Sequence, residues 1–64
     1  MRAIVHAQQT NHDGRKNVYR ISFDTLRDAR RFVMGSRRPE RAVIECDSYW
    51  ETYENGHMLA QEAR

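Results

Sequence analysis

Hydrophobic and polar residues alternate with a period of two between Val18 and Phe23. Tyr19, Ile21 and Phe23 fall on one side of an extended chain, and the residues between them fall on the other. Successive side chains of a strand point to opposite faces of its sheet. The pattern therefore predicts a half-buried strand over residues 18–23.

A first strand is predicted over residues 2–9, where Ile4 and Val5 stand between alanines. Residues 11–17 are polar, rich in turn-forming side chains and without periodicity, which predicts a loop. A loop of this length favours antiparallel pairing of the two strands that it connects.

Signals at both ends define a helix after the second strand. Thr25 is followed three residues later by Asp28, a pattern similar to the capping box that begins many helices. Gly35 is placed to end the helix, and Pro39 prevents it from resuming. A helix is therefore predicted from Thr25 to residue 34.

This helix has an apolar face and a basic face. The side chains predicted to point inward, at helical spacing, are Leu26, Ala29 and Val33, with Phe32 beside them. The side chains predicted to point outward are Arg27, Arg30, Arg31 and Met34. The helix is expected to pack on the sheet through its apolar stripe.

Three further strands are predicted after the helix. Residues 42–47 alternate in polarity, and residues 49–54 are rich in aromatic side chains. Asn55 and Gly56 both accept the positive φ of a type I′ hairpin turn, which predicts a return strand over residues 57–61. Helix propensity offers one or two helical turns as the alternative for this last segment.

Together these elements predict an α+β fold in a single small domain, residues 1–64. An antiparallel sheet of four to five strands would form from two strands before the helix and two or three after it. The helix would pack on one face of the sheet and leave the other face largely solvated. A chain of 64 residues buries one small core and is not expected to enclose a deep substrate pocket.

Composition limits where such a protein works. No apolar run approaches the roughly 18–20 residues that cross a bilayer, and the N-terminal stretch lacks the apolar segment of a signal peptide. Cys46 is the only cysteine, so no intramolecular disulfide can form. A cytoplasmic protein without membrane contact is expected, with Cys46 as a small buried hydrophobe.

The spacing of the reactive residues does not match a catalytic or metal site. His6, His12, His57 and Cys46 are the candidate metal ligands, but they form no zinc-type motif. The three glycines are isolated, so no phosphate-binding loop is present. The carboxylates of the last predicted strands are best explained as an exposed acidic sheet face. The chain is predicted to be a non-enzyme that uses no cofactor or metal.

Charge is divided unevenly along the chain. Residues 1–41 hold ten basic side chains against four acidic ones, a net charge of +6, whereas residues 42–64 carry −4. Six arginines concentrate on the predicted helix and the segment after it: Arg27, Arg30, Arg31, Arg37, Arg38 and Arg41. Because arginine suits phosphate and carboxylate groups, these six are predicted to bind a polyanion or an acidic protein surface. A solvated helix face is the alternative.

The aromatic residues of segment 49–54 are divided between the two faces of the predicted sheet. Alternation places Trp50 opposite Tyr49 and Tyr53. Trp50 is predicted to pack under the helix. Tyr49 and Tyr53 would then lie on the open face as a stacking platform or partner contact.

Three stretches of the chain resemble a type I-F anti-CRISPR family of very small phage-encoded proteins. They are the N-terminal Met-Arg-Ala-Ile strand, the basic helix Leu26–Val33 and the hairpin Tyr49–Gly56. The family has a similar start, a similar Leu-x-x-Ala-basic-basic-apolar helix and a similar Leu-Trp-x-x-Tyr-x-x-x-Gly hairpin. The likeness covers most of the chain in outline. This sequence departs from it in Arg37-Arg38 and in lacking the family's final aromatic residue.

The resemblance implies a five-stranded antiparallel sheet with one helix, and inhibition of an RNA-guided CRISPR surveillance complex. The family binds the backbone subunits of that complex where target DNA must hybridise with the guide, and Arg30 and Arg31 match its adjacent basic pair. The implied protein is a phage or mobile-element inhibitor in the cytoplasm of a bacterial host. It would act as a monomer or weak dimer and block or misdirect binding of target DNA.

Two other classes of function stay open at this point. The first is a small basic nucleic-acid-binding protein of phage or bacterial origin, whose arginines contact the phosphates of DNA or RNA. The second is a structural accessory protein that dimerises through an exposed edge strand.

Overall fold

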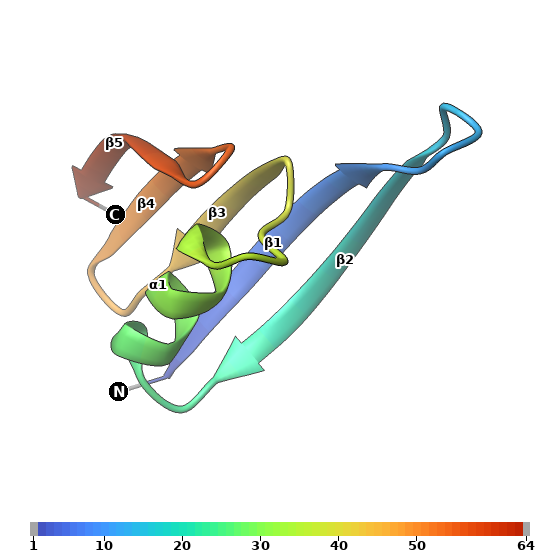
Figure 1. Cartoon of the computed structure of the whole chain (residues 1–64). Helices are drawn as coiled ribbons and strands as arrows, with labels where there is room; N and C mark the ends of the chain where they lie inside the picture. The colour runs from blue at the N-terminus through green and yellow to red at the C-terminus, as the bar shows by residue number, and fades with distance from the viewer. Residues whose placement is uncertain (1, 64) are drawn as a thin grey trace.

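A computed structural model describes residues 2–63 and has two layers, an antiparallel sheet and one helix packed on one of its faces (Figure 1). The elements are β1 (Ala3–Thr10), β2 (Lys16–Phe23), α1 (Leu26–Met34), β3 (Arg41–Glu45), β4 (Tyr49–Glu54) and β5 (His57–Ala63). The five strands lie in the order β2-β1-β3-β4-β5. The predicted α+β fold, with one helix on one face of the sheet, is confirmed.

The register of the sheet decides which side chains face the helix. Val5 of β1 pairs with Ile21 of β2 and with Ile44 of β3, and Ile44 pairs with Glu51 of β4. Residues that pair directly share a face of a sheet. These four side chains therefore point to the face that carries the helix. The side chains of the residues directly before and after them in each strand point to the open face.

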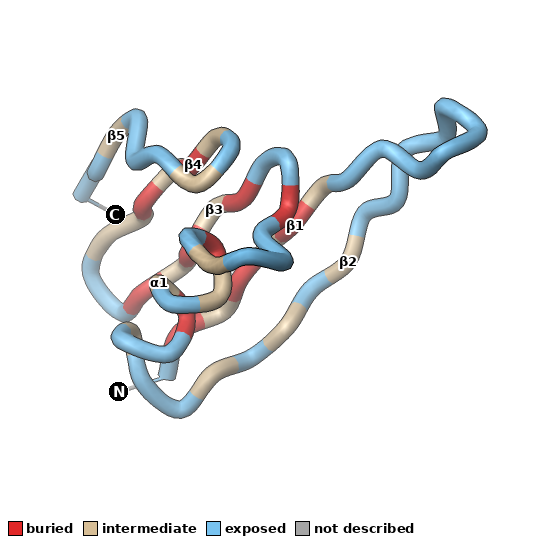
Figure 2. Tube along the Cα trace, viewed as in Figure 1, coloured by how far each residue is buried: buried red, intermediate tan, exposed pale blue. Residues whose placement is uncertain are grey.

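The core lies between α1 and the central strands. Its buried side chains are Ala3, Val5, Ala7, Ala29, Val33, Ala42, Ile44, Cys46 and Tyr53. Figure 2 shows these buried positions on β1, β3, β4 and the inner side of α1, whereas the outer part of the β1–β2 hairpin is exposed. This hairpin projects beyond the helix, which accounts for the elongated shape of 36 × 21 × 17 Å.

The ends of α1 follow the predicted signals. The Thr25 side chain accepts a hydrogen bond of 3.1 Å from the backbone N–H of Asp28. Gly35 caps the other end with φ −80°, so it does not adopt the left-handed conformation common at this position. A glycine is required at this position because a Cβ atom would lie 2.8 Å from the carbonyl oxygen of Arg31.

The predicted hairpin at Asn55-Gly56 is also confirmed. Both residues have positive φ, 51° and 84°, and they connect β4 to β5. The helical alternative for the last segment is wrong, because residues 57–63 pair with β4 as a strand. The register of this pair shifts between Thr52 and Tyr53, which marks a β-bulge.

The faces predicted for the aromatic residues are wrong. Tyr53 pairs with Ala42 and is buried in the core, with only 2% of its surface exposed. Trp50 pairs with Glu45 on the opposite side of the sheet, where its ring centroid lies 6.4 Å from that of His6. Alternation separated the two aromatics correctly, but it could not decide which of them faces the helix.

Gly56 gives a test of the turn. We expect Gly56→Ala to lower the free energy of unfolding by about 2 kcal/mol, because Ala disfavours positive φ and its Cβ would lie 2.7 Å from Cδ of Arg38. Gly14→Ala is the matched control, since Gly14 has φ +83° and no atom within 4 Å of the added Cβ. It should cost about 1 kcal/mol by urea denaturation.

A double variant separates the two causes. In an Arg38→Ala background the added Cβ no longer meets the Arg38 side chain. Gly56→Ala should then lower the free energy of unfolding by no more than Gly14→Ala does. An equal cost of Gly56→Ala with and without Arg38 would show that this close approach does not affect stability.

Candidate protein-binding surface

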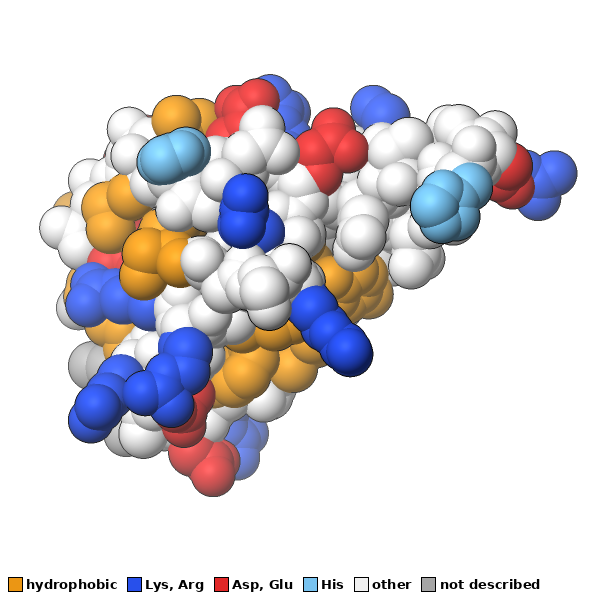
Figure 3. All heavy atoms as spheres, in the orientation of Figure 1, with side chains coloured by type: hydrophobic (Ala, Val, Ile, Leu, Met, Phe, Trp, Pro, Cys, Tyr) orange, Lys and Arg blue, Asp and Glu red, His pale blue; other side chains and the backbone are white. Residues whose placement is uncertain are grey.

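The helix-bearing side of the molecule displays a group of basic side chains around α1 (Figure 3). Arg27 and Arg31 on α1 are exposed, as is Arg37 in the following loop. Within residues 2–63, none of these three makes an ion pair with a carboxylate. Their charges are therefore available to a partner.

Arg30 differs from its helix neighbours, and its predicted outward orientation is wrong. Its side chain turns toward the sheet and is 37% exposed. The Nε atom donates a hydrogen bond of 2.9 Å to Oε1 of Glu51, and Nη2 donates to Oε2 of the same carboxylate. This two-point contact is the fork geometry that arginine makes with carboxylates.

Glu51 is fully buried, and four donors satisfy its carboxylate. Besides the two from Arg30, the Tyr53 hydroxyl donates to Oε1 at 3.0 Å and Nε2 of Gln61 donates to Oε2 at 2.9 Å. Hydrogen bonds from Arg30 above all, then from Tyr53 and Gln61, hold the pKa of Glu51 below its ordinary value against the opposing effect of burial. The group is therefore a buried, ionised carboxylate with a structural role.

Tyr53 belongs to this network rather than to a binding face. Burial and the neighbouring Glu51 carboxylate raise the pKa of Tyr53 to about 12. Tyr49 is half-buried and packs against the core. Neither tyrosine forms the open stacking platform that was predicted.

Arg38 and Arg41 also have partners within the chain. Arg38 donates from Nε to the carbonyl oxygen of Asn55 at 3.1 Å and from Nη1 to that of Gly35 at 3.2 Å. It thereby ties the loop after α1 to the β4–β5 turn. Arg41 lies 3.8 Å from Glu54 on the open side of the sheet. The six arginines therefore do not form one continuous patch.

The cations of α1 border a shallow depression of about 430 Å³ lined by Leu26, Arg27, Arg30, Arg31 and Met34, which we call the arginine surface. Met34 is 49% exposed and Leu26 is half-buried. These apolar side chains were not predicted as part of the site. Their spacing of eight residues, with Arg30 midway between them, places all three on one stripe of the helix and was the available signal.

The potential metal ligands and the thiol occupy separate places. Among residues 2–63, no group of three or more His, Cys, Asp or Glu side chains could hold a metal ion. Cys46 is buried, and burial raises the pKa of its thiol, so it is protonated at neutral pH. The predicted burial of Cys46 is confirmed.

Comparison with protein-family models, with curated proteins and with solved structures finds no match to this chain. In the part of the chain that the structure describes, no helix is long and apolar enough to span a membrane.

Arg30→Ala tests the structural role of this arginine. It leaves the buried Glu51 carboxylate without its cation, so we expect a loss of about 3 kcal/mol in the free energy of unfolding, measured by urea denaturation. Arg31→Ala is the matched control on the same helix and should cost less than about 0.5 kcal/mol. Similar losses in both variants would contradict the role assigned to Arg30.

The pH dependence of stability follows from Glu51. Its pKa is lower in the folded chain than in the unfolded chain, so its contribution is complete above the unfolded value and is lost as the pH falls. We expect the free energy of unfolding to decrease below about pH 5. Glu51→Gln should be less stable at pH 7 and less sensitive to acid. Glu62→Gln, at an exposed position, should retain the wild-type profile.

Proposed function

We propose that this chain is a small binding protein, not an enzyme, that docks through the arginine surface on an acidic protein surface. The observation that carries the proposal is the exposure of Arg27 and Arg31, without carboxylate partners in residues 2–63, beside Leu26 and Met34. Like charges four residues apart on a helix repel each other. A partner that supplies carboxylates to both would relieve this repulsion.

The apolar side chains favour protein over nucleic acid as the partner. A phosphate backbone is bound through cations and hydrogen bonds, and gains little from a methionine and a leucine between them. A protein partner can place an apolar anchor on Leu26 and Met34 while its carboxylates meet Arg27 and Arg31. Arg30 has N–H donors beyond the two atoms that bind Glu51, and it can add a further contact without moving.

Among acidic protein surfaces, we propose the backbone subunits of a CRISPR surveillance complex in a bacterial cytoplasm. The resemblance to the type I-F anti-CRISPR family supports this choice, and the observed sheet with one helix is the fold that the resemblance implied. Such complexes hold nucleic acid in basic channels. An inhibitor of opposite charges, with arginines on α1 and the solvent-accessible carboxylates of Glu54 and Glu62 on β4 and β5, can contact both the acidic patches and the lysines around a channel. Target DNA would then be blocked or misdirected.

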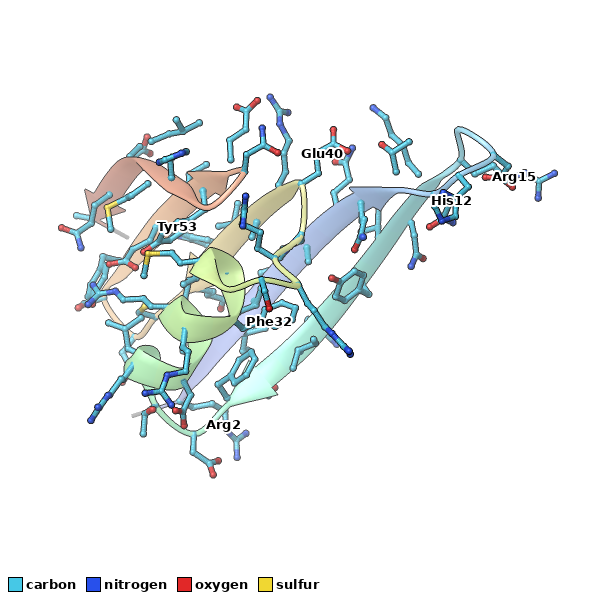
Figure 4. All side chains as sticks on the ribbon, viewed as in Figure 1. Arg2, His12, Arg15, Phe32, Glu40 and Tyr53 are labelled. Atoms are coloured by element: carbon cyan, nitrogen blue, oxygen red, sulfur yellow. The ribbon has the colours of Figure 1, made fainter. Side chains whose placement is uncertain are left out.

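Nucleic-acid binding is the second candidate function, and the β1–β2 hairpin favours it. The hairpin extends beyond α1, with His12 and Arg15 at its tip (Figure 4), and Lys16 begins the returning strand. A two-stranded ribbon of this kind fits the major groove of DNA. Arg15 and Lys16 would contact phosphates there, and binding would weaken steeply with salt.

A reversal of two charges tests the proposal. Arg27→Glu with Arg31→Glu should weaken binding to purified surveillance complexes about 100-fold, because two carboxylates would face the acidic surface. The wild-type protein should prevent the complex from binding target DNA, and the double variant should not. Both quantities can be measured with fluorescent target DNA and with the labelled protein.

Arg15→Glu with Lys16→Glu is the control, because it makes the same change in net charge at the hairpin tip. This variant should inhibit as the wild type does. If only the hairpin variant loses binding, and binding is to DNA with a steep salt dependence, the second candidate is correct. Undiminished binding by the α1 variant would mean that the arginine surface is only a solvated helix face.

A further inference from the structure

The open face of the sheet, opposite α1, carries an apolar band with charges at its sides. Among the residues that the structure describes, the register places four larger apolar side chains there, Ile4, Val18, Val43 and Trp50. Leu59, in the β-bulge of β5, lines a hollow on the same face. Val18 is 74% exposed and Leu59 is 61% exposed. The half-buried Val43 lies between them in the lining of the same hollow, and an exposed apolar patch of this kind indicates a contact surface.

This band contains a hollow of about 380 Å³. Its lining includes residues from all five strands, with Val18 on β2 and Leu59 on β5 at opposite sides of the sheet. Val43, on the central strand β3, lies in the floor. A partner that fits this face needs one apolar side chain opposite Val18 and another opposite Leu59.

The charges of the open face run from positive to negative across the sheet. Lys16 and Arg20 lie on β2 at one edge, and Glu62 lies on β5 at the other. None of these three forms an ion pair within residues 2–63. A partner with the reverse order of charges would complement this face.

We propose that the occupant of this face is a second copy of the chain, related by a two-fold axis that runs along β3. Such an axis places β2 of one copy over β5 of the other, as in the aligned packing of two sheets. Val43 would then meet its own counterpart. The axis preserves position along the strands, so Val18 would face His57 of the second copy, with Leu59 two residues further along the same strand. Arg20 would face Ala60 of the second copy, and its long side chain would extend toward Glu62, two residues further along the same strand, so the positive edge of each sheet would cover the acidic edge of the other.

Charges near the axis do not oppose this arrangement strongly. Arg41 and Glu45 would lie close to their own counterparts, but Arg41 has an opposite charge beside it and Glu45 has a hydrogen-bond partner in the same chain. Arg41 is 3.8 Å from Glu54, and Nε2 of His6 lies 3.0 Å from Oε1 of Glu45. These internal contacts reduce the repulsion across the axis.

The size of the face predicts a weak dimer. Five strands about 4.8 Å apart and about six residues long, at roughly 3.3 Å per residue, give a face of about 480 Å². Two such faces together reach about 1,000 Å², near the lower limit of specific interfaces. Sedimentation velocity should therefore show the mass rising from one chain of 7.6 kDa toward two between about 1 µM and 1 mM.

Charge exchange across the dimer provides the decisive experiment. Arg20→Glu and Glu62→Arg should each raise the dimer dissociation constant about tenfold, because like charges would then meet between copies. The variant with both changes should return to within about threefold of the wild type. Arg20 and Glu62 lie on opposite edge strands, about 19 Å apart across four strand spacings, so a restoration of dimerisation can only come from contact between copies.

Three controls complete the test. Leu59→Glu should abolish dimerisation, whereas Arg31→Glu, on the helix side, should leave it unchanged. A chain that stays monomeric at 1 mM overturns the proposal. A dimer that survives Leu59→Glu, or that does not respond to the charge exchanges, also overturns it and indicates pairing through a strand edge. These outcomes are independent of the proposed docking through the arginine surface, which lies on the other face.

Discussion

The contact between Arg30 and the buried carboxylate of Glu51 holds the two layers of this small protein together. The helix packs on β1, β2 and β3 through its buried side chains Ala29 and Val33 and through the ring contact of Phe32 with Phe23, and Arg30 extends this attachment to β4. Through Gln61, the same carboxylate also holds the edge strand β5. A buried carboxylate is costly unless it is fully satisfied, and a shift of α1 along the sheet would remove the two Arg30 donors from Glu51.

The same contact determines which arginines remain for binding. Arg30 neutralises Glu51, and Arg38 supplies hydrogen bonds to two loop carbonyls, so neither is a free surface cation. Arg27 and Arg31 flank Arg30 on the helix and keep their full charge. An arginine-rich segment thus combines a structural cation with binding cations, and residue type alone does not separate them.

The order of the strands turns the uneven distribution of charge along the chain into an uneven distribution of charge across the sheet. The basic strand β2 and the acidic region of β4 and β5 lie at opposite edges, because β1 and β3 pair in the centre. The open face therefore has a direction of charge, and a two-fold axis makes such a face complementary to itself. The helix side, with its exposed arginines, has no such balance and suits a different, acidic partner.

The sequence by itself determined the local structure: the helix and its Thr25 cap, the Asn55-Gly56 turn and the strands on either side depend on neighbouring residues. It also determined that Trp50 and Tyr53 lie on opposite faces of β4. Only the tertiary structure decided which face is buried, because alternation is the same for both and a charged residue such as Glu51 is typical of a surface. Its burial depends on Arg30, which is 21 residues away in the chain and reaches the carboxylate only when the helix is packed on the sheet.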